Sequence, residues 1–143
     1  MQEGQEEQSN VLLTQWQTCV EMANSVSQRR DGMNNIFVTL NLAIVATVSF
    51  VWSIKSIFLL VAGVFVSSIW LLFIRNFKLL NDAKFQVINQ LEQKLPYDPF
   101  AEEWKKLKLS KGYMDGTKLE RSLPISFIIL YSAAILFIII KKL

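Results

Sequence analysis

The stretch IFVTLNLAIVATVSFVWSI (residues 36–54), a link of Lys55 and Ser56, and IFLLVAGVFVSSIWLLFI (residues 57–74) decide the fold. The two apolar segments hold 19 and 18 residues, close to the roughly 20 that a helix needs to cross a hydrocarbon core about 30 Å thick. Neither segment contains a charged residue, and no acid occurs between Asp31 and Asp82. Because a charge at bilayer depth costs about 2.5–3.5 kcal/mol on insertion scales, the sequence predicts two membrane-spanning helices joined as a tight hairpin.

A third apolar segment, PISFIILYSAAILFIII (residues 124–140), follows later in the chain. A sequence of 143 residues has too little remaining mass to bury three fully apolar helices in a soluble core. The predicted fold is therefore all-α, with three transmembrane helices and cytoplasmic helical extensions. Its expected segments are an N-terminal helix (1–35), the transmembrane hairpin (36–74), a cytoplasmic helical segment (75–123) and the third transmembrane helix (124–143).

The basic residues predict the orientation in the membrane. Of the fifteen lysines and arginines, two precede the first span and ten lie between the second and third spans. Lys55, Lys141 and Lys142 fall on the other side. Since basic residues accumulate on the cytoplasmic side, we expect a membrane protein with its N-terminus in the cytoplasm and its C-terminus on the opposite side of the membrane.

The segment before the first span has two expected parts. Residues 1–10 are rich in Gln and Glu, and we expect them to be disordered. A helix over residues 9–32 follows and continues into the first span, with a break or bend near Gly32. Its apolar residues repeat with spacings of 4, 3, 4 and 3, which is typical of a heptad seam. The seam packs either on its own chain or between subunits; it consists of Leu12, Trp16, Cys19, Ala23 and Val26.

Between the second and third spans, the pattern predicts further helices. Residues 76–95 show an amphipathic pattern that ends at Pro96. Residues 96–100 contain two prolines and predict a rigid turn. A short helix over residues 101–109, with Trp104 and Leu107 as apolar anchors, and a loop over residues 110–117 complete this segment.

Polar side chains form a mixed stripe along the first span. At 100° per residue, five of them share an arc of about 120° with several apolar residues. One interpretation is a pore lining in an oligomer, partly polar and partly a hydrophobic constriction. The other is that Asn41 bonds a neighbouring helix while the serines bond their own backbone. The pore-lining candidates are Asn34, Asn41, Val45, Ser49 and Trp52.

A run of basic residues with interleaved aromatics precedes the third span. Anionic lipid headgroups are the first candidate partner, because the run abuts the membrane. An anionic ligand such as single-stranded nucleic acid, stacked on Trp104 and Tyr113, is the second. The candidate lipid or ligand face consists of Arg29, Arg30, Lys105, Lys106, Lys108 and Lys111.

The residues suggest no catalytic chemistry. There is no histidine and only one cysteine, so the commonest general base and the usual metal clusters are missing. No phosphate-binding glycine loop, HExxH motif or nucleophile elbow is present. Glu102 and Glu103 are adjacent and point about 100° apart on a helix, so they suit a solvated helix start better than paired acid–base work. We expect no enzyme, no metal site and no cofactor.

Several short motifs resemble the RipA-type family of small oligomeric bacterial membrane proteins. The resemblance covers residues 15–135 and is spread over many positions. It is carried by Glu21-Met22-Ala23, Val26-Ser27-Gln28-Arg29-Arg30, Asn34, Asn35, Phe37, Leu40-Asn41, Trp70, Arg75-Asn76, Leu80-Asn81, Ala83-Lys84-Phe85, Leu91-Glu92, Leu95-Pro96, Pro99-Phe100, Glu103-Trp104, Leu119-Glu120, Pro124 and Tyr131.

This resemblance implies a function that the residue patterns alone do not. Its closest described members resemble the membrane channel effector (HalA) of the Hailong anti-phage defence system. It implies a homo-oligomeric inner-membrane ion channel, with a tetramer as the candidate assembly, that depolarises the membrane and arrests the infected host. A nucleotide or single-stranded DNA oligomer, made by a nucleotidyltransferase-like partner protein, would hold it closed or gate it. The alternatives are a non-conducting scaffolding oligomer with a cytoplasmic docking surface and a regulatory subunit of a larger complex.

Overall fold

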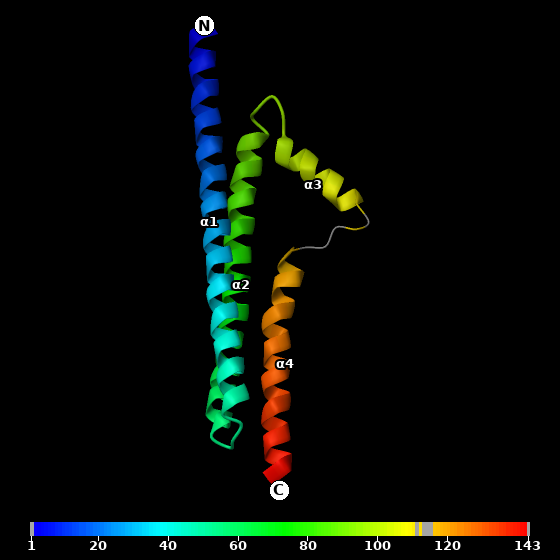
Figure 1. The fold of residues 1–143 in the computed structure, drawn as a ribbon. Helices are drawn as coiled ribbons and strands as arrows, with labels where there is room; N and C mark the ends of the chain where they lie inside the picture. The colour runs from blue at the N-terminus through cyan, green and yellow to red at the C-terminus, as the bar shows by residue number, and fades with distance from the viewer. Residues whose placement is uncertain (1, 111, 113–115, 143) are drawn as a thin grey trace. The chain divides into compact units, whose positions relative to one another are not determined.

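The computed structural model describes residues 2–110, 112 and 116–142. Within these residues the chain is all-helical, with α1 (Gln2–Phe50), α2 (Ser56–Glu92), α3 (Pro99–Leu109) and α4 (Gly116–Lys142) (Figure 1). Three of these helices, α1, α2 and α4, contain stretches long and apolar enough to cross a membrane. The predicted all-α class with three transmembrane helices is confirmed.

The chain divides into two compact units. The polar unit combines Met1–Arg29 with Phe77–Met114, and the membrane unit combines Arg30–Asn76 with Asp115–Leu143. Helices α1 and α2 each contribute to both units. Helix α3 belongs to the polar unit and α4 to the membrane unit.

Helix α1 is longer and more continuous than the sequence pattern predicted. Residues 2–10 are helical, so the expectation of disorder is wrong for them; Gln and Glu are good helix formers and propagate a helix that already exists. Gly32 neither ends nor breaks the helix, and no glycine among the described residues has a positive φ. A single glycine costs only about 1 kcal/mol relative to alanine, which the turns on either side of it outweigh.

The hairpin turn is longer than the predicted two residues. Helix α1 ends at Phe50, and residues 51–55 form the connection to α2. Buried Ser56 closes this turn: its amide donates to Ser53 O at 2.9 Å, and its hydroxyl accepts from Ser53 N at 3.2 Å and donates to Val51 O. Trp52 therefore lies in the turn, and the helical spacing used to place it in the polar stripe does not apply.

Helix α2 joins two predicted elements into one. It contains the second span and most of the amphipathic segment, and it ends at Glu92, three residues before the predicted end. Helix α3 starts at Pro99 rather than after it, because a proline suits the first helical turn, where its missing N–H has no partner to lose. Helix α4 begins eight residues before Pro124, which lies inside it.

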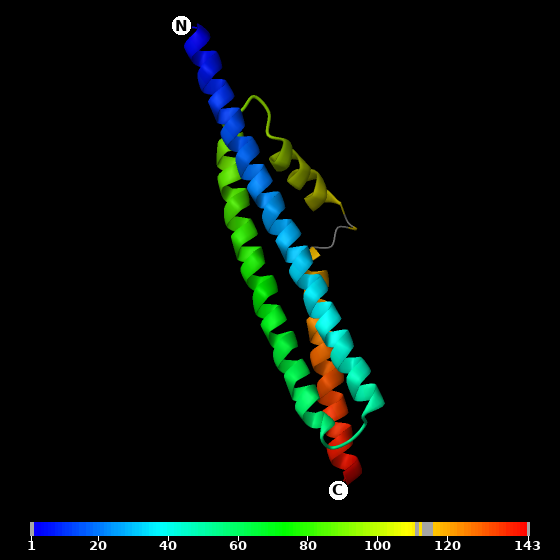
Figure 2. The ribbon, with the colours of Figure 1, turned by 60° about the vertical axis from the view of Figure 1, so that its left-hand side comes forward.

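In the membrane unit, α1, α2 and α4 lie side by side, with α2 antiparallel to the other two (Figures 1 and 2). One apolar cluster is built on Val48, Leu60, Tyr131 and Ile138, and a second on Phe37, Trp70 and Ile74. The outward faces carry many large apolar side chains, Phe58 at 83% exposure among them. Such exposure is the normal condition of a helix facing lipid, because lipid tails are as apolar as leucine.

Candidate functional site

Asn41 of α1 is the centre of a polar cluster inside the membrane unit. Its side chain is fully buried, at 0% exposure. The amide oxygen accepts hydrogen bonds from Ser67 Oγ of α2 at 2.8 Å and from Tyr131 Oη of α4 at 2.9 Å. The amide nitrogen donates to Phe37 O, one turn earlier in α1, at 2.8 Å. One side chain from each of the three membrane helices thus meets at Asn41.

Gly63 makes room for the ring of Tyr131. A β-carbon at position 63 would lie 2.6 Å from Tyr131 Cε2 and 2.8 Å from Cζ, far inside the normal carbon–carbon contact of about 3.5–4.0 Å. Only glycine lets the ring lie flat against α2 and carry its hydroxyl to Asn41. The close approach of α2 and α4 therefore depends on this one residue.

A second interhelical hydrogen bond lies at Trp70 of α2. Its indole Nε1 donates to Asn34 Oδ1 of α1 at 2.8 Å. The indole also stacks on Phe37 of α1, with ring centroids 5.7 Å apart and ring planes 7° apart. Trp70 is 1% exposed, so both its apolar body and its polar tip are used within the chain.

These contacts are suited to holding helices together rather than to chemistry. The carbonyl oxygen of an asparagine side chain has two lone pairs, and both are used by Ser67 and Tyr131. Asn41 therefore has no acceptor left for a cation. The described residues of the cluster include no carboxylate, lysine or arginine, and the phenol of Tyr131 is engaged in its bond to Asn41.

The structure separates the five predicted pore-lining residues. Asn34 and Asn41 bond other helices of the same chain, and Val45 packs against the cluster around Val48 and Tyr131. Ser49 is exposed, and its hydroxyl donates to Val45 O at 2.8 Å. Trp52 is exposed in the turn, with its ring 6.2 Å from that of Phe137. Asn41 has no surface on the isolated chain, so it reaches a pore only if the helices part; its pore-lining role stays a prediction.

A different face of α1 is both polar and exposed. Asn35, Thr39, Ala43 and Thr47 follow one another at intervals of four residues, and all four are exposed; we call them the outward row. The hydroxyls of Thr39 and Thr47 donate to Asn35 O and Ala43 O at 2.8 Å, so they need no partner outside the helix. The predicted stripe left out both threonines, although small residues spaced by four are a known signature of helix–helix contact in membranes.

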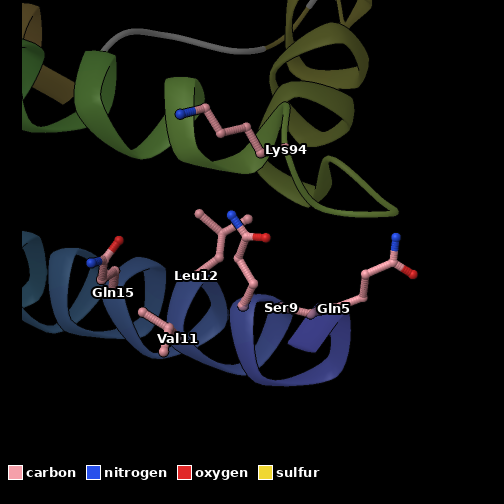
Figure 3. A pocket seen from close by; sticks show the side chains of 7 residues that line it. Gln5, Ser9, Val11, Leu12, Gln15 and Lys94 are labelled. Atoms are coloured by element: carbon pink, nitrogen blue, oxygen red, sulfur yellow. The ribbon is translucent and has the colours of Figure 1, made fainter. Parts of the chain in front are cut away.

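The predicted heptad seam lies largely inside the polar unit. Ala23 and Val26 are 3% and 1% exposed. Trp16 is partly buried, with its ring 5.9 Å from that of Phe100 of α3. Cys19 is partly buried with a free thiol. Leu12 lines an open groove of about 490 Å³ with Lys94 and glutamines of α1 (Figure 3). Ala23 and Val26 are therefore packed within the chain itself, and packing of the seam between subunits stays a prediction.

The predicted basic face also divides. Arg30 of α1 pairs with Glu120 of α4 at 2.8 Å inside the membrane unit, where both side chains are 21% exposed. Arg29 stays exposed, and its Nε donates weakly to Ser25 O at 3.4 Å. Lys105, Lys106 and Lys108 are exposed on α3 of the polar unit. Lys111, like the aromatic Tyr113, lies outside the described residues.

A buried acid, absent from every predicted site, positions α3. Glu92 ends α2 and is 1% exposed. Its two carboxylate oxygens accept from Phe100 N at 3.0 Å and Ala101 N at 3.3 Å, amides that otherwise lack partners at a helix start. The side chain of Asp98, the N-cap residue, makes no capping bond. Glu92 therefore supplies the cap from another helix, an interaction that no local sequence pattern reveals.

The comparisons with known proteins agree with this fold. A model of the octameric membrane protein family (8xMP) matches residues 13–140. The chain belongs to this family. The match spans all three apolar helices and most of both units, so oligomerisation in a membrane is a property of the family as a whole. No curated protein and no solved structure matches the chain at a significant level.

Proposed function

We propose that this protein forms an octameric ion channel in the bacterial inner membrane, with the outward row of α1 facing the pore. The observation that carries the proposal is the polarity of this row, because the outward faces of the other two helices are mostly apolar, with single exposed serines such as Ser68 and Ser126. In α2 the outward residues include Phe58, Phe65 and Leu72, at 83%, 66% and 58% exposure. Those side chains suit lipid, whereas Asn35, Thr39, Ala43 and Thr47 suit water or another helix.

Subunit number decides how wide such a pore is. Helices packed about 9 Å apart in a ring of eight have their axes about 12 Å from the centre. A helix with side chains is about 10 Å across, so the ring leaves an open radius of about 7 Å. Four helices at the same spacing leave about 1 Å by the same geometry. The family description names eight subunits rather than the four expected from the sequence, and eight leave room for hydrated ions.

A pore of this width needs a hydrophobic constriction to close. Phe50 is the last residue of α1 and is 90% exposed. At 100° per residue it lies in the middle of the arc covered by the outward row. A ring of eight such phenylalanines would narrow one mouth of the pore and exclude water, which is how hydrophobic gates close.

The biological role that we propose is defence against phage. Here the protein is a non-catalytic effector that stays closed until infection, then depolarises the membrane and arrests the host. A nucleotide or single-stranded DNA oligomer from a nucleotidyltransferase-like partner protein controls the gate. The support is the similarity to the RipA-type family and to HalA of the Hailong system. The twelve basic residues that precede the first span or connect the second and third spans support a cytoplasmic N-terminus and a periplasmic C-terminus.

A non-conducting scaffold is the second candidate. The observation that favours it is the cluster at Asn41, where interior polar groups are satisfied within one chain. Because these interior polar groups already have partners within the chain, they need no water-filled pore beside them. In that case the outward row would pack against a neighbouring subunit and conduct nothing.

Conductance of the purified protein in planar bilayers, with and without single-stranded DNA oligomers, tests the channel. Stepwise currents are expected, and replacing Thr47 by leucine should reduce them without changing the oligomer measured by native mass spectrometry. Replacing Ser126 by leucine is the matched control, because Ser126 is also exposed and its hydroxyl bonds its own helix at 2.8 Å. Silent bilayers from intact octamers would favour the scaffold.

The constriction has its own matched pair of variants. Phe50→Ala should raise the open probability or leak current, because it removes the large exposed ring that lies at the end of α1 within the arc covered by the outward row. Phe58→Ala removes a ring of similar exposure, 83% against 90%, from the start of α2 and should leave the current unchanged. Equal effects of the two variants on the current would show that Phe50 does not line the pore.

A further inference from the structure

Helix α3 packs against the polar unit at its N-terminal half and carries exposed side chains along its C-terminal half. Phe100 packs between Trp16 and Phe85, with ring centroids 5.9 Å and 5.6 Å away. Glu92 caps the first turn through the amides of Phe100 and Ala101. The helix is thus held by its N-terminal half, and its C-terminal half carries the exposed side chains.

The exposed C-terminal half is basic and partly apolar. Lys105 and Lys106 are exposed, and Leu109 at the helix end is 82% exposed. Trp104 is half-exposed, and Lys108 Nζ lies 5.6 Å from the centre of its ring. The two acids of the helix, Glu102 and Glu103, lie in or next to its first turn, so opposite charges are segregated along α3. The C-terminal half has three lysines and no acid.

We infer that this lysine face of α3 (Trp104, Lys105, Lys106, Lys108 and Leu109) binds an anionic lipid surface. Lysines near a membrane are attracted to its negative headgroups. A tryptophan and a terminal leucine beside them can enter the headgroup region, where an indole ring is well accommodated. In sequence the face is followed, after residues 110–115, by the helix that contains the third span, so the same chain is anchored in the bilayer.

Charge and shape favour lipid over nucleic acid at this face. Binding of single strands relies on several aromatic rings on which successive bases stack. The lysine face has one indole, and Lys108 already lies over it. Among the described residues, Tyr97 is an exposed aromatic close to α3 in sequence, and it lies before the helix, at the end opposite the lysines. The exposed leucine has a use in a headgroup layer and none in a base stack.

A single fluorescent label on the full-length protein tests this inference. The only native cysteine is Cys19, so Cys19→Ser combined with Ser110→Cys gives one labelling site, exposed and adjacent to the face. An environment-sensitive fluorophore is read in nanodiscs of neutral phosphatidylcholine and in nanodiscs with about one-third phosphatidylglycerol. We expect a blue shift, and quenching by brominated lipid, only in the anionic discs. High salt should reverse both, because it screens exposed charges.

Two variants make the test specific. Replacing Lys105, Lys106 and Lys108 together by glutamine should abolish the lipid-dependent shift. Each lysine that is removed should weaken the association of the face with anionic membrane about fivefold. A label at Gln17→Cys, exposed on α1 of the same unit, should not respond to lipid charge. Unchanged oligomer mass and an unchanged far-ultraviolet circular dichroism spectrum would show that the triple variant is folded.

Other outcomes would overturn the inference. Equal label signals in neutral and anionic discs, or a triple variant that responds like the parent, would mean that the face does not bind lipid. A shift that follows added single-stranded DNA in neutral discs, with no response to anionic lipid, would assign the face to nucleic acid instead. None of these readouts depends on conductance, so the channel proposal and this one can fail separately.

Discussion

Replacing Gly63 by alanine should force α2 and α4 apart, because the new methyl group meets the Tyr131 ring. The added β-carbon would lie 2.6, 2.8 and 2.9 Å from three ring atoms, so the ring must move by about 1 Å to restore normal contact. Tyr131 is 1% exposed and has little free space into which to move. Any shift of the ring also lengthens its 2.9 Å hydrogen bond to Asn41.

The expected loss follows from three contributions. Overpacking of a filled interior costs about 1–3 kcal/mol. A weakened interhelical hydrogen bond adds about 0.6 kcal/mol, and up to about 1.7, in membrane proteins. Alanine returns about 0.8–1.0 kcal/mol through its higher helix propensity. The net destabilisation of Gly63→Ala is therefore about 1–3 kcal/mol.

The background at position 131 changes the sign of this effect. The valine side chain of the Tyr131→Val variant ends at Cγ, so this variant lacks the three ring atoms that would clash with a β-carbon at position 63. In that background Gly63→Ala should be neutral or stabilise by up to about 1 kcal/mol. The coupling between the two positions is then about 1–4 kcal/mol, which overlaps the range of about 0.5–3 kcal/mol known for contacting residues.

Reversible unfolding by SDS in mixed micelles, followed by tryptophan fluorescence, measures all four members of this cycle. Ala62→Val, at the neighbouring exposed position, is the control and should leave the midpoint unchanged. An identical effect of Gly63→Ala in both backgrounds would refute the claim that Tyr131 is what alanine meets.

Three further predictions concern contacts between helices. Glu92→Ala should destabilise the polar unit by about 0.5–2 kcal/mol through loss of the α3 cap and raise amide hydrogen exchange over residues 99–109. Glu92→Gln keeps one acceptor and should lose less stability. Equal exchange in both variants would count against the cap. Arg30→Gln or Glu120→Gln should each cost about 1–3 kcal/mol in the same SDS titration, because the remaining partner keeps a partly buried charge. The double variant should lose less stability than the sum of the two single variants. Strict additivity of the two losses would contradict the ion pair. Trp70→Phe and Asn34→Ala should each cost about 0.6–1.7 kcal/mol and be non-additive when combined, as circular dichroism melting in detergent would show; a full sum of the two losses would argue against their hydrogen bond.

Hydrophobicity and charge allowed much of the architecture to be predicted without a structure. Runs of apolar residues as long as a bilayer is thick have one stable conformation in lipid, because every backbone polar group must bond within the segment. The three spans therefore follow from composition alone. The helix ends did not, since residues 2–10 and Gly32 carry weak local preferences that helix propagation overrides.

Only the tertiary structure decided which polar residues are interior. Asn34, Asn41 and Ser49 fit one arc of α1, yet the first two bond α2 or α4 and the last is exposed. The physical reason is that helical spacing gives directions around one axis and contains no information on where the neighbouring helices lie. Ser67, Tyr131 and Glu92 find their partners across long sequence separations, so their roles appear only when the helices are packed. The sequence by itself thus determined that the chain enters the membrane with three helices. The packing of those helices decided which polar side chains are buried between them and which stay exposed on their outer surface.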